Sequence, residues 1–210
     1  VPFYVDETFA RLFGFLIGDG NINKEKTCLS FSTSLDLELN NYYRNILQQY
    51  FGCVKFSQDK RLKNGLGKVY VSSAIACKIF SEMGYVGNHN VIRIPTWVFT
   101  APKNIRRAFV EGLSDADGCE RYTKAGTWFS TIELSNKKLI EDIKELWSSI
   151  GLCSGHIKHR FRIGGHEVAV GRKITNTTSY SITISDCILP QSENVLLVSP
   201  DGQQEVFDIT

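Results

Sequence analysis

The 210-residue chain lacks several features that would place it in a specialised class of proteins. It has no apolar run of the roughly 18 residues that a membrane-spanning helix needs. The N-terminus has neither the basic start nor the apolar stretch of a signal peptide. The six cysteines are widely scattered without a C-x-x-C pair, which argues against a zinc site and against a small disulfide scaffold. These absences favour an intracellular protein with reduced, mostly buried thiols.

The composition is that of an ordinary globular protein, with 42% hydrophobic and 22% charged residues. It excludes disordered, collagen-like and coiled-coil proteins. The chain is long enough to bury a core without disulfides, either as one large domain or as two domains of about 100 residues.

Charge is unevenly distributed along the chain, although the net charge is only +2. Residues 55–68 hold five basic side chains against one acidic side chain, and so do residues 156–173. The rest of the chain must therefore be net acidic. Two basic segments on an acidic background indicate a polyanion-binding surface. Exposed loops and strand faces are also often rich in lysine, so charge alone leaves both interpretations open.

The chain repeats itself at an offset of 98 residues. Residues 10–20, ARLFGFLIGDG, match residues 108–118, AFVEGLSDADG, with Ala, Gly, Asp and Gly at equivalent places. The same offset aligns Phe31-Ser32-Thr33 with Phe129-Ser130-Thr131. Two matches at one offset indicate an internal duplication.

Each repeat predicts a similar order of elements from its hydrophobic periodicity. In the first repeat we expect helices over about 7–18, 36–51 and 74–83, and strands near 27–33, 53–60 and 67–73. In the second we expect helices over about 103–116 and 136–150, and strands near 127–134, 153–163 and 178–185. This order predicts an α+β fold, with antiparallel sheets covered by helices on one face.

Both repeated helices end in the same dipeptide, Asp19-Gly20 and Asp117-Gly118. The glycines are expected in left-handed cap positions. The aspartates are unusual, because a carboxylate in the last turn meets the negative end of the helix dipole, at a cost of about 0.3–1 kcal/mol when exposed. One such helix end is an ordinary turn. Two at equivalent positions imply a cation beside them.

Small residues lie four apart in each repeated helix, Gly14 and Gly18 in one and Gly112 and Ala116 in the other. They would let the two helices cross at close range, so that the two aspartates end side by side. Two carboxylates facing one point suit Mg²⁺, with water and substrate phosphate oxygens completing its shell.

These two segments resemble the LAGLIDADG, or dodecapeptide, signature of homing endonucleases. Asp19 and Asp117 fall on its last acidic position. Its earlier acidic position is Asp115 in the second copy but Ile17 in the first, a departure at a site that the family treats as nonessential. The resemblance covers about residues 8–186, and the segment from Ile94-Pro95-Thr96-Trp97 to Ala101-Pro102-Lys103 resembles the endonuclease domains of inteins.

The resemblance implies three parts: a first LAGLIDADG half over 1–93, a second over 94–188, and a tail over 189–210. The tail contains Glu205-Val206-Phe207-Asp208-Ile209-Thr210, which resembles the start of an intein C-terminal splicing block. The sequence stops before the His-Asn pair that splicing requires and starts without a Cys or Ser nucleophile. We therefore expect an endonuclease region of an intein that has no splicing activity of its own.

The family resemblance also implies a fold and a partner. Two pseudo-symmetric αββαββα halves would place their antiparallel sheets as a saddle over double-stranded DNA, and both halves in one chain would act as a monomer. The two basic segments would line the saddle, one in each half. The candidate DNA-binding residues are Lys55, Arg61, Lys68, Lys158, Arg160, Arg162 and Lys173. For each of them, a solvated surface charge is the alternative.

The implied activity is that of a Mg²⁺-dependent endodeoxyribonuclease with a long recognition site and a staggered cut that leaves 3′-hydroxyls. Asp19 and Asp117 would hold the metal, with Ca²⁺ or Mn²⁺ as substitutes for Mg²⁺, and the backbone carbonyls of Gly18 and Ala116 would be further ligands. Lys68 is the first candidate for an assisting lysine and Lys173 the second. The remaining polar candidates, which would order solvent near the scissile bonds or cap helices, are Thr33, Ser34 and Ser135.

Two alternatives belong to other classes. A non-catalytic nucleic-acid-binding protein on the same scaffold, such as an intron RNA maturase or a transcription regulator, would be favoured by loss of a motif carboxylate. Both carboxylates are present, which favours the nuclease. The third possibility is an unrelated α+β protein whose repeat is fortuitous. A nuclease would work wherever its target DNA is, in the cytoplasm, nucleus or an organelle matrix.

Overall fold

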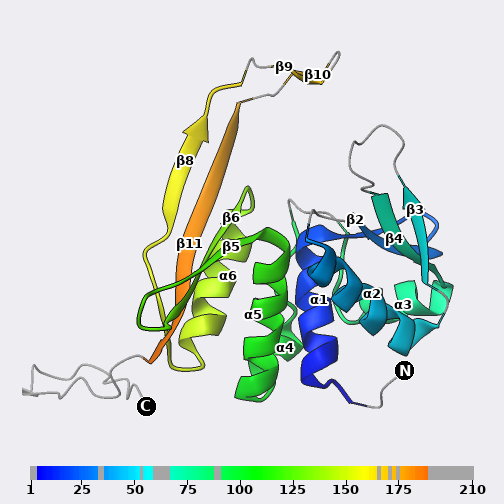
Figure 1. Ribbon diagram of the computed structural model, residues 1–210, viewed down its shortest axis with the longest axis horizontal. Coiled ribbons are helices and arrows are strands. Elements are labelled where there is room, and N and C mark those ends of the chain that lie inside the picture. Colours follow the sequence, from blue (N-terminus) through cyan, green and yellow to red (C-terminus); the bar gives the residue numbers. More distant parts are fainter. Residues whose placement is uncertain are drawn as a thin grey trace, which may run out of the picture.

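The computed structural model describes residues 4–32, 36–52, 54–58, 67–87, 91–164, 167–169, 172–173 and 176–188. Two helices stand side by side at its centre, and a sheet flanks them on each side (Figure 1). The predicted α+β fold with antiparallel sheets is confirmed. In the described part of the chain, no helix is long and apolar enough to cross a bilayer.

The first half has the αββαββα order that the resemblance implies. Its elements are α1 (Glu7–Asp19), β1 (Gly20–Ile22), β2 (Cys28–Ser32), α2 (Leu37–Phe51), β3 (Val54–Gln58), β4 (Gly67–Ser72) and α3 (Ala74–Glu82). The four strands form one antiparallel sheet in the order β1-β2-β4-β3.

The second half begins with α4 (Thr96–Thr100) and the long helix α5 (Lys103–Asp117). It continues through β5 (Gly118–Tyr122), β6 (Trp128–Leu134), α6 (Lys137–Ser148), β7 (Leu152–Ser154), β8 (Lys158–Arg162), β9 (Glu167–Ala169), β10 (Arg172–Lys173) and β11 (Thr177–Ile188). Its sheet has the order β5-β6-β11-β7, and β8 pairs with the other end of β11. The described residues of this half end on β11, so they show no counterpart of α3, the helix that follows the last strand of the first sheet.

Most of the helices form where the sequence supplies both an apolar stripe and a polar cap, whereas α4 and α5 begin after a proline without a side-chain cap. Asp6 accepts a hydrogen bond from Phe9 N (2.7 Å) at the start of α1. Asp36 and Asn136 do the same for the first turns of α2 and α6. The apolar faces meet in one hydrophobic core whose largest buried side chains include Trp147 and Tyr43. Ser135 is exposed and does not cap α6, because Asn136 fills that place.

The sheet register shows that the predicted match between the strands of the two repeats is out of register. Gly20 pairs with Phe31, whereas Gly118 pairs with Ile132, so the second hairpin is three residues longer than the first. The structural counterpart of Phe31 is therefore Ile132, and both side chains are buried. Phe129 lies on the other face of its strand and is only partly buried. The strand match at offset 98 was wrong; only the helix match reflects equivalent positions.

Two smaller expectations also need correction. Gly20 and Gly118 have extended rather than left-handed backbones, with φ of −74° and −91°. They are required for space, since a Cβ at Gly20 would lie 2.8 Å from Leu16 Cα and one at Gly118 would lie 2.6 Å from Ser114 Oγ. Among the five cysteines described, which are all free, only Cys77 is buried. The thiols are therefore not mostly buried.

The segment between the halves is held to both of them. On the first half, the Trp97 indole donates to Met83 O (2.9 Å). On the second half, Arg93 forms a bidentate pair with Asp142, whose side chain is only 5% exposed. Asn136 also donates to Ile92 O (2.7 Å). The connection thus fixes the position of one half against the other, although the boundary at residues 93 and 94 stays a prediction.

Candidate active site at the paired helix ends

The two central helices cross at their glycines, as predicted. A Cβ at Gly14 would lie 2.9 Å from the carbonyl carbon of Phe109, and one at Gly112 would lie 2.7 Å from the carbonyl carbon of Arg11. Gly112 and Phe109 each stand 98 positions after Gly14 and Arg11. The contact is therefore reciprocal, as a two-fold axis between α1 and α5 requires.

The crossing brings the two motif carboxylates together at one end of the helix pair. A Cβ at Gly18 would lie 2.5 Å from Ala116 Cβ and 2.6 Å from Asp117 Oδ2. The missing side chain at Gly18 thus leaves room for the Asp117 carboxylate against the end of α1. Burial, with a smaller contribution from the negative charge of Asp19, raises the pKa of Asp117 to about 6. Asp19 itself is exposed.

The donor set fits a magnesium-type ion better than zinc. It consists of two hard carboxylates, and the described residues contain no group of three or more His, Cys, Asp or Glu side chains that could hold a metal. Mg²⁺ is commonly held by one or two carboxylates plus waters and substrate phosphates, whereas zinc sites need three or four protein ligands. Gly18 and Ala116 lie in the last turns of their helices, where carbonyl groups lack the usual helical donor. They can therefore serve as further ligands.

The earlier acidic position of the motif has a structural role. Asp115 accepts from Arg11 Nε (2.8 Å) and Arg11 Nη2 (3.1 Å), and from the Tyr43 hydroxyl. Burial opposes the charge of Arg11, but the hydrogen bond and the charge of Asp115 raise its pKa overall. The positions related to Arg11 and Asp115 by the repeat are Phe109 and Ile17, both buried and apolar. An ion pair thus stabilises one side of the helix pair, and buried apolar side chains occupy the equivalent positions on the other side. This difference explains why the first motif has Ile17 where the second has Asp115.

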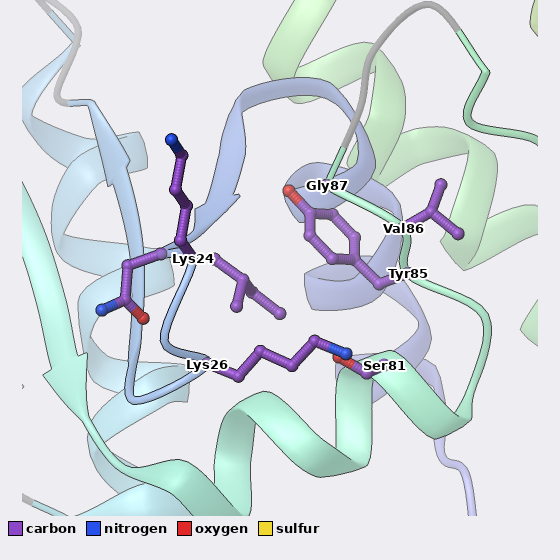
Figure 2. A pocket seen from close by; sticks show the side chains of 8 residues that line it. Lys24, Lys26, Ser81, Tyr85, Val86 and Gly87 are labelled. Carbon is purple, nitrogen blue, oxygen red and sulfur yellow. The ribbon is translucent and has the colours of Figure 1, made fainter.

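A pocket of about 380 Å³ lies between the β1–β2 hairpin and the segment after α3 (Figure 2). Tyr85 lines it and donates its hydroxyl to Gly20 O (2.6 Å). Burial raises the pKa of the Tyr85 phenol further above its ordinary value. Gly20 follows Asp19 directly, and Tyr85 therefore helps to fix the start of β1 beside the candidate site.

Most of the candidate DNA-binding residues share the exposed faces of the two sheets. In the first sheet, Lys55 pairs with Tyr70 and Ser57 with Lys68, on the face opposite the buried Val69 and Val71. In the second sheet, the residues on the face opposite the buried Ile182 and Ile184 are Lys158, Arg160 and Arg162. Arg61 lies outside the described residues, as do Thr33 and Ser34.

The two candidate lysines lie in different places. Lys68 is exposed on β4, opposite Ser32 of β2. Lys173 belongs to β10, which lies at the tip of the arm formed by β8 and β11, away from the end of α5 (Figure 1). Val69 pairs with Phe31 in the first sheet, and Ile182 pairs with the equivalent Ile132 in the second. Val69 and Ile182 are therefore equivalent, and so are the residues before them, Lys68 and Ser181. In the second half, the lysine next to that position is Lys158, directly across from Ser181.

The raised pKa of Asp117 predicts how stability depends on pH. Above about pH 6 the buried charge destabilises the native state, and below about pH 4 the group is protonated in both states. Asp117→Asn should therefore stabilise the metal-free protein at pH 8 by ~1–2 kcal/mol, or ~5 °C in melting temperature. The gain should vanish at pH 4. Asp19→Asn should give a smaller gain, because Asp19 is exposed.

Thermal melts in EDTA at pH 4, 6 and 8 measure this difference. Millimolar Ca²⁺ should stabilise the wild type more than either variant. A lower melting temperature for Asp117→Asn than for wild type at pH 8 in EDTA would mean that the carboxylates are not crowded together.

Comparison with known proteins places the chain in a family. The family model described as Homing endonuclease matches residues 93–197, which is half of the chain. The chain belongs to the homing endonuclease family. A mesophilic variant of the homing endonuclease I-DmoI has the same fold, with a TM-score of 0.51 and 16% identity over 85% of this chain and 88% of the I-DmoI chain.

Two archaeal proteins are similar to this homing endonuclease chain in sequence. A DNA polymerase of Thermococcus kodakarensis is 29% identical over 163 residues, which are 74% of this chain and 9% of the polymerase. A DNA polymerase of Pyrococcus horikoshii is 25% identical over 206 residues, 98% of this chain and 14% of the polymerase. The chain therefore spans only a small part of the length of these relatives.

Proposed function

We propose that this protein is a site-specific endonuclease that hydrolyses both strands of DNA with a divalent cation. It would recognise a long site and make a staggered cut that leaves 3′-hydroxyls. One observation carries the proposal: Asp19 and Asp117, from two reciprocal motif helices, meet where Gly18 leaves space for a carboxylate. The family membership agrees with it.

Each residue of the candidate site has a part in this chemistry. When bound, Mg²⁺ would lower the pKa of an attacking water and neutralise charge on the phosphate, with Ca²⁺ or Mn²⁺ as substitutes. Asp19 and Asp117 would hold it, together with the carbonyls of Gly18 and Ala116. Lys68 is exposed on the sheet face, where its ammonium group can contact a phosphate oxygen. We favour Lys68 over Lys173 because β10 lies at the tip of the arm.

The exposed sheet faces are the proposed DNA surface. Two motif helices in one chain supply both halves, so the protein would act as a monomer. Lys55 and Lys68 in one sheet, and Lys158, Arg160 and Arg162 in the other, would neutralise phosphates or contact bases in the major groove. Arg61 and Lys173 remain candidates from the sequence.

This surface predicts a salt effect. We expect a smaller slope of log affinity against log salt concentration when four basic residues are changed together to Gln, namely Lys55, Lys68, Lys158 and Arg160. The slope should decrease in magnitude by about three to four, since each phosphate contact contributes about 0.9. A matched control changes four exposed helix lysines, Lys78, Lys103, Lys137 and Lys138. Binding titrations at several salt concentrations measure both slopes. Equal flattening by the control set would place the DNA elsewhere.

The relation to the polymerases supports an intein origin. The aligned segments cover 74% and 98% of this chain but only 9% and 14% of the two polymerases. An inserted nuclease region has this pattern, and it would act on DNA inside the cell.

The proposal is tested by incubating the protein with a randomised double-stranded DNA library and Mg²⁺, then sequencing the new ends. We expect 3′-hydroxyl ends with a constant stagger and one shared flanking sequence. Ends without a shared sequence, or ends that form equally well in EDTA, would contradict the proposal.

A further inference from the structure

Three side chains from three neighbouring strands meet on the exposed face of the second sheet. Arg162 Nη2 of β8 lies 2.6 Å from Glu133 Oε1 of β6. Ser179 of β11 donates its hydroxyl to the same oxygen, at 2.5 Å. The strands lie in the order β6-β11-β8, so Arg162 reaches across the middle strand to its partner.

The trio lies on the face that we propose for DNA. Glu133 pairs with Ser181, and Ser181 pairs with Lys158, so these residues share one side of the sheet. The Arg162 side chain is 55% exposed and that of Glu133 is 30% exposed. The guanidinium has five N–H donors, and the bond to Glu133 uses one Nη2 hydrogen. Donors of the same planar group therefore remain available on its solvent side.

A carboxylate on this face works against binding to DNA in general. Non-specific affinity comes from neutralised phosphates, and Glu133 cancels one of the positive charges that could do this. It also stays ionised, because the hydrogen bond from Ser179 and the charge of Arg162 lower the pKa of Glu133. Any contribution of Glu133 to DNA binding must therefore come from something other than its charge.

Glu133 can contribute by fixing the orientation of the Arg162 guanidinium. An arginine that is free to rotate pairs with any nearby phosphate, whereas a guanidinium held in one orientation fits only a partner whose acceptors lie in the matching direction. Its planar fork fits O6 and N7 of guanine in the major groove. We propose that Glu133 is a positioning residue that holds Arg162 for recognition of one guanine in the target site. The inference rests on the proposed function, since it requires a specific DNA target.

The experiment begins with selection of bound sequences from a randomised duplex library by the wild-type protein, in Ca²⁺. The selection is repeated with Arg162→Ala, Glu133→Ala and the double variant. Glu141→Ala is the matched control, since Glu141 pairs with Lys137 on α6 and not on the sheet face.

We expect Arg162→Ala and Glu133→Ala to lose the same guanine preference and to leave the other positions of the site unchanged. Glu133→Ala should bind a scrambled duplex about threefold to tenfold more tightly, because a negative charge is gone. Its ratio of specific to scrambled affinity should fall at least tenfold. In the Arg162→Ala background, Glu133→Ala should change no base preference, because it acts through Arg162.

Other results would overturn the inference. If Glu133→Ala raises all affinities equally and keeps every base preference, Glu133 affects only charge. If the two single variants change different positions, Glu133 does not act through Arg162. If the wild-type protein selects no sequence at all, the proposed site-specific function fails, which is distinguishable from failure of the role of Glu133.

Discussion

Asp19→Asn and Asp117→Asn should each abolish double-strand cleavage. Each change removes one of the two carboxylates, the proposed metal ligands, that the crossing of α1 and α5 brings together. Loss of the bound cation would remove several kcal/mol of transition-state stabilisation, and the rate should fall by ~10³-fold or more. DNA affinity should stay within about tenfold, or ~1.4 kcal/mol, because most binding would come from the sheet faces.

The measurement uses a DNA substrate selected from the randomised library, with Mg²⁺ at neutral pH. Glu111→Gln is the matched control, because Glu111 lies on α5 in an exposed pair with Arg107, away from the helix end. It should cleave like the wild type. Full cleavage by either aspartate variant would rule out the metal role of that residue.

Gly14→Ala and Gly112→Ala should destabilise the protein strongly and to a similar degree. In each case the new Cβ would overlap the backbone carbonyl group of the facing helix, Phe109 for Gly14 and Arg11 for Gly112. A backbone carbonyl cannot rotate away as a side chain can, so the helices must separate. We expect a loss of ~3 kcal/mol or more, above the usual range for overpacking, and a melting temperature lower by ~10 °C.

Gly155→Ala is the control for this prediction. A Cβ there would lie 3.4 Å from Thr183 O and meet no closer atom, and its backbone is not in the left-handed region. Its effect should stay within about 0.5 kcal/mol. If Gly14→Ala melts within 2 °C of the wild type, the helices do not cross at the glycines.

The sequence allowed the central helix pair to be predicted because its signals are local. Helical spacing, two small residues four apart and an Asp-Gly end are all visible within a dozen residues of each repeat. The reciprocal contacts of Gly14 and Gly112 then follow from the duplication. The core helices α2 and α6 were equally predictable, because apolar stripes end at Gly52 and Gly151, both with positive φ.

The strand register and the long-range ion pairs could not be predicted in the same way. β1 has only three residues and follows α1 directly, so it leaves no alternating pattern to recognise. The longer second hairpin moved the counterpart of Phe31 from Phe129 to Ile132. Arg11 and Asp115 pair across 104 positions, and no short-range pattern marks either residue for its partner.

Hairpin lengths also decide which residues of the two halves are equivalent. Lys68 and Lys173 were the first and second lysine candidates, and the position equivalent to Lys68 in the second sheet is Ser181 rather than a lysine. Which residues share a sheet face depends on hairpin lengths, and a one-residue change in register moves every side chain to the other face.

The central claim is that the paired helix ends hold a divalent cation. Its most direct test is titration of the ¹⁵N-labelled protein with Mn²⁺, whose paramagnetism broadens the amide signals nearest to it. We predict that the signals of Gly18, Gly20, Ala116 and Gly118 broaden first, and that Asp19→Asn or Asp117→Asn prevents this. Broadening centred elsewhere, for example at the pocket of about 330 Å³ that is lined by Glu111, Glu120 and Asp186, would contradict the account.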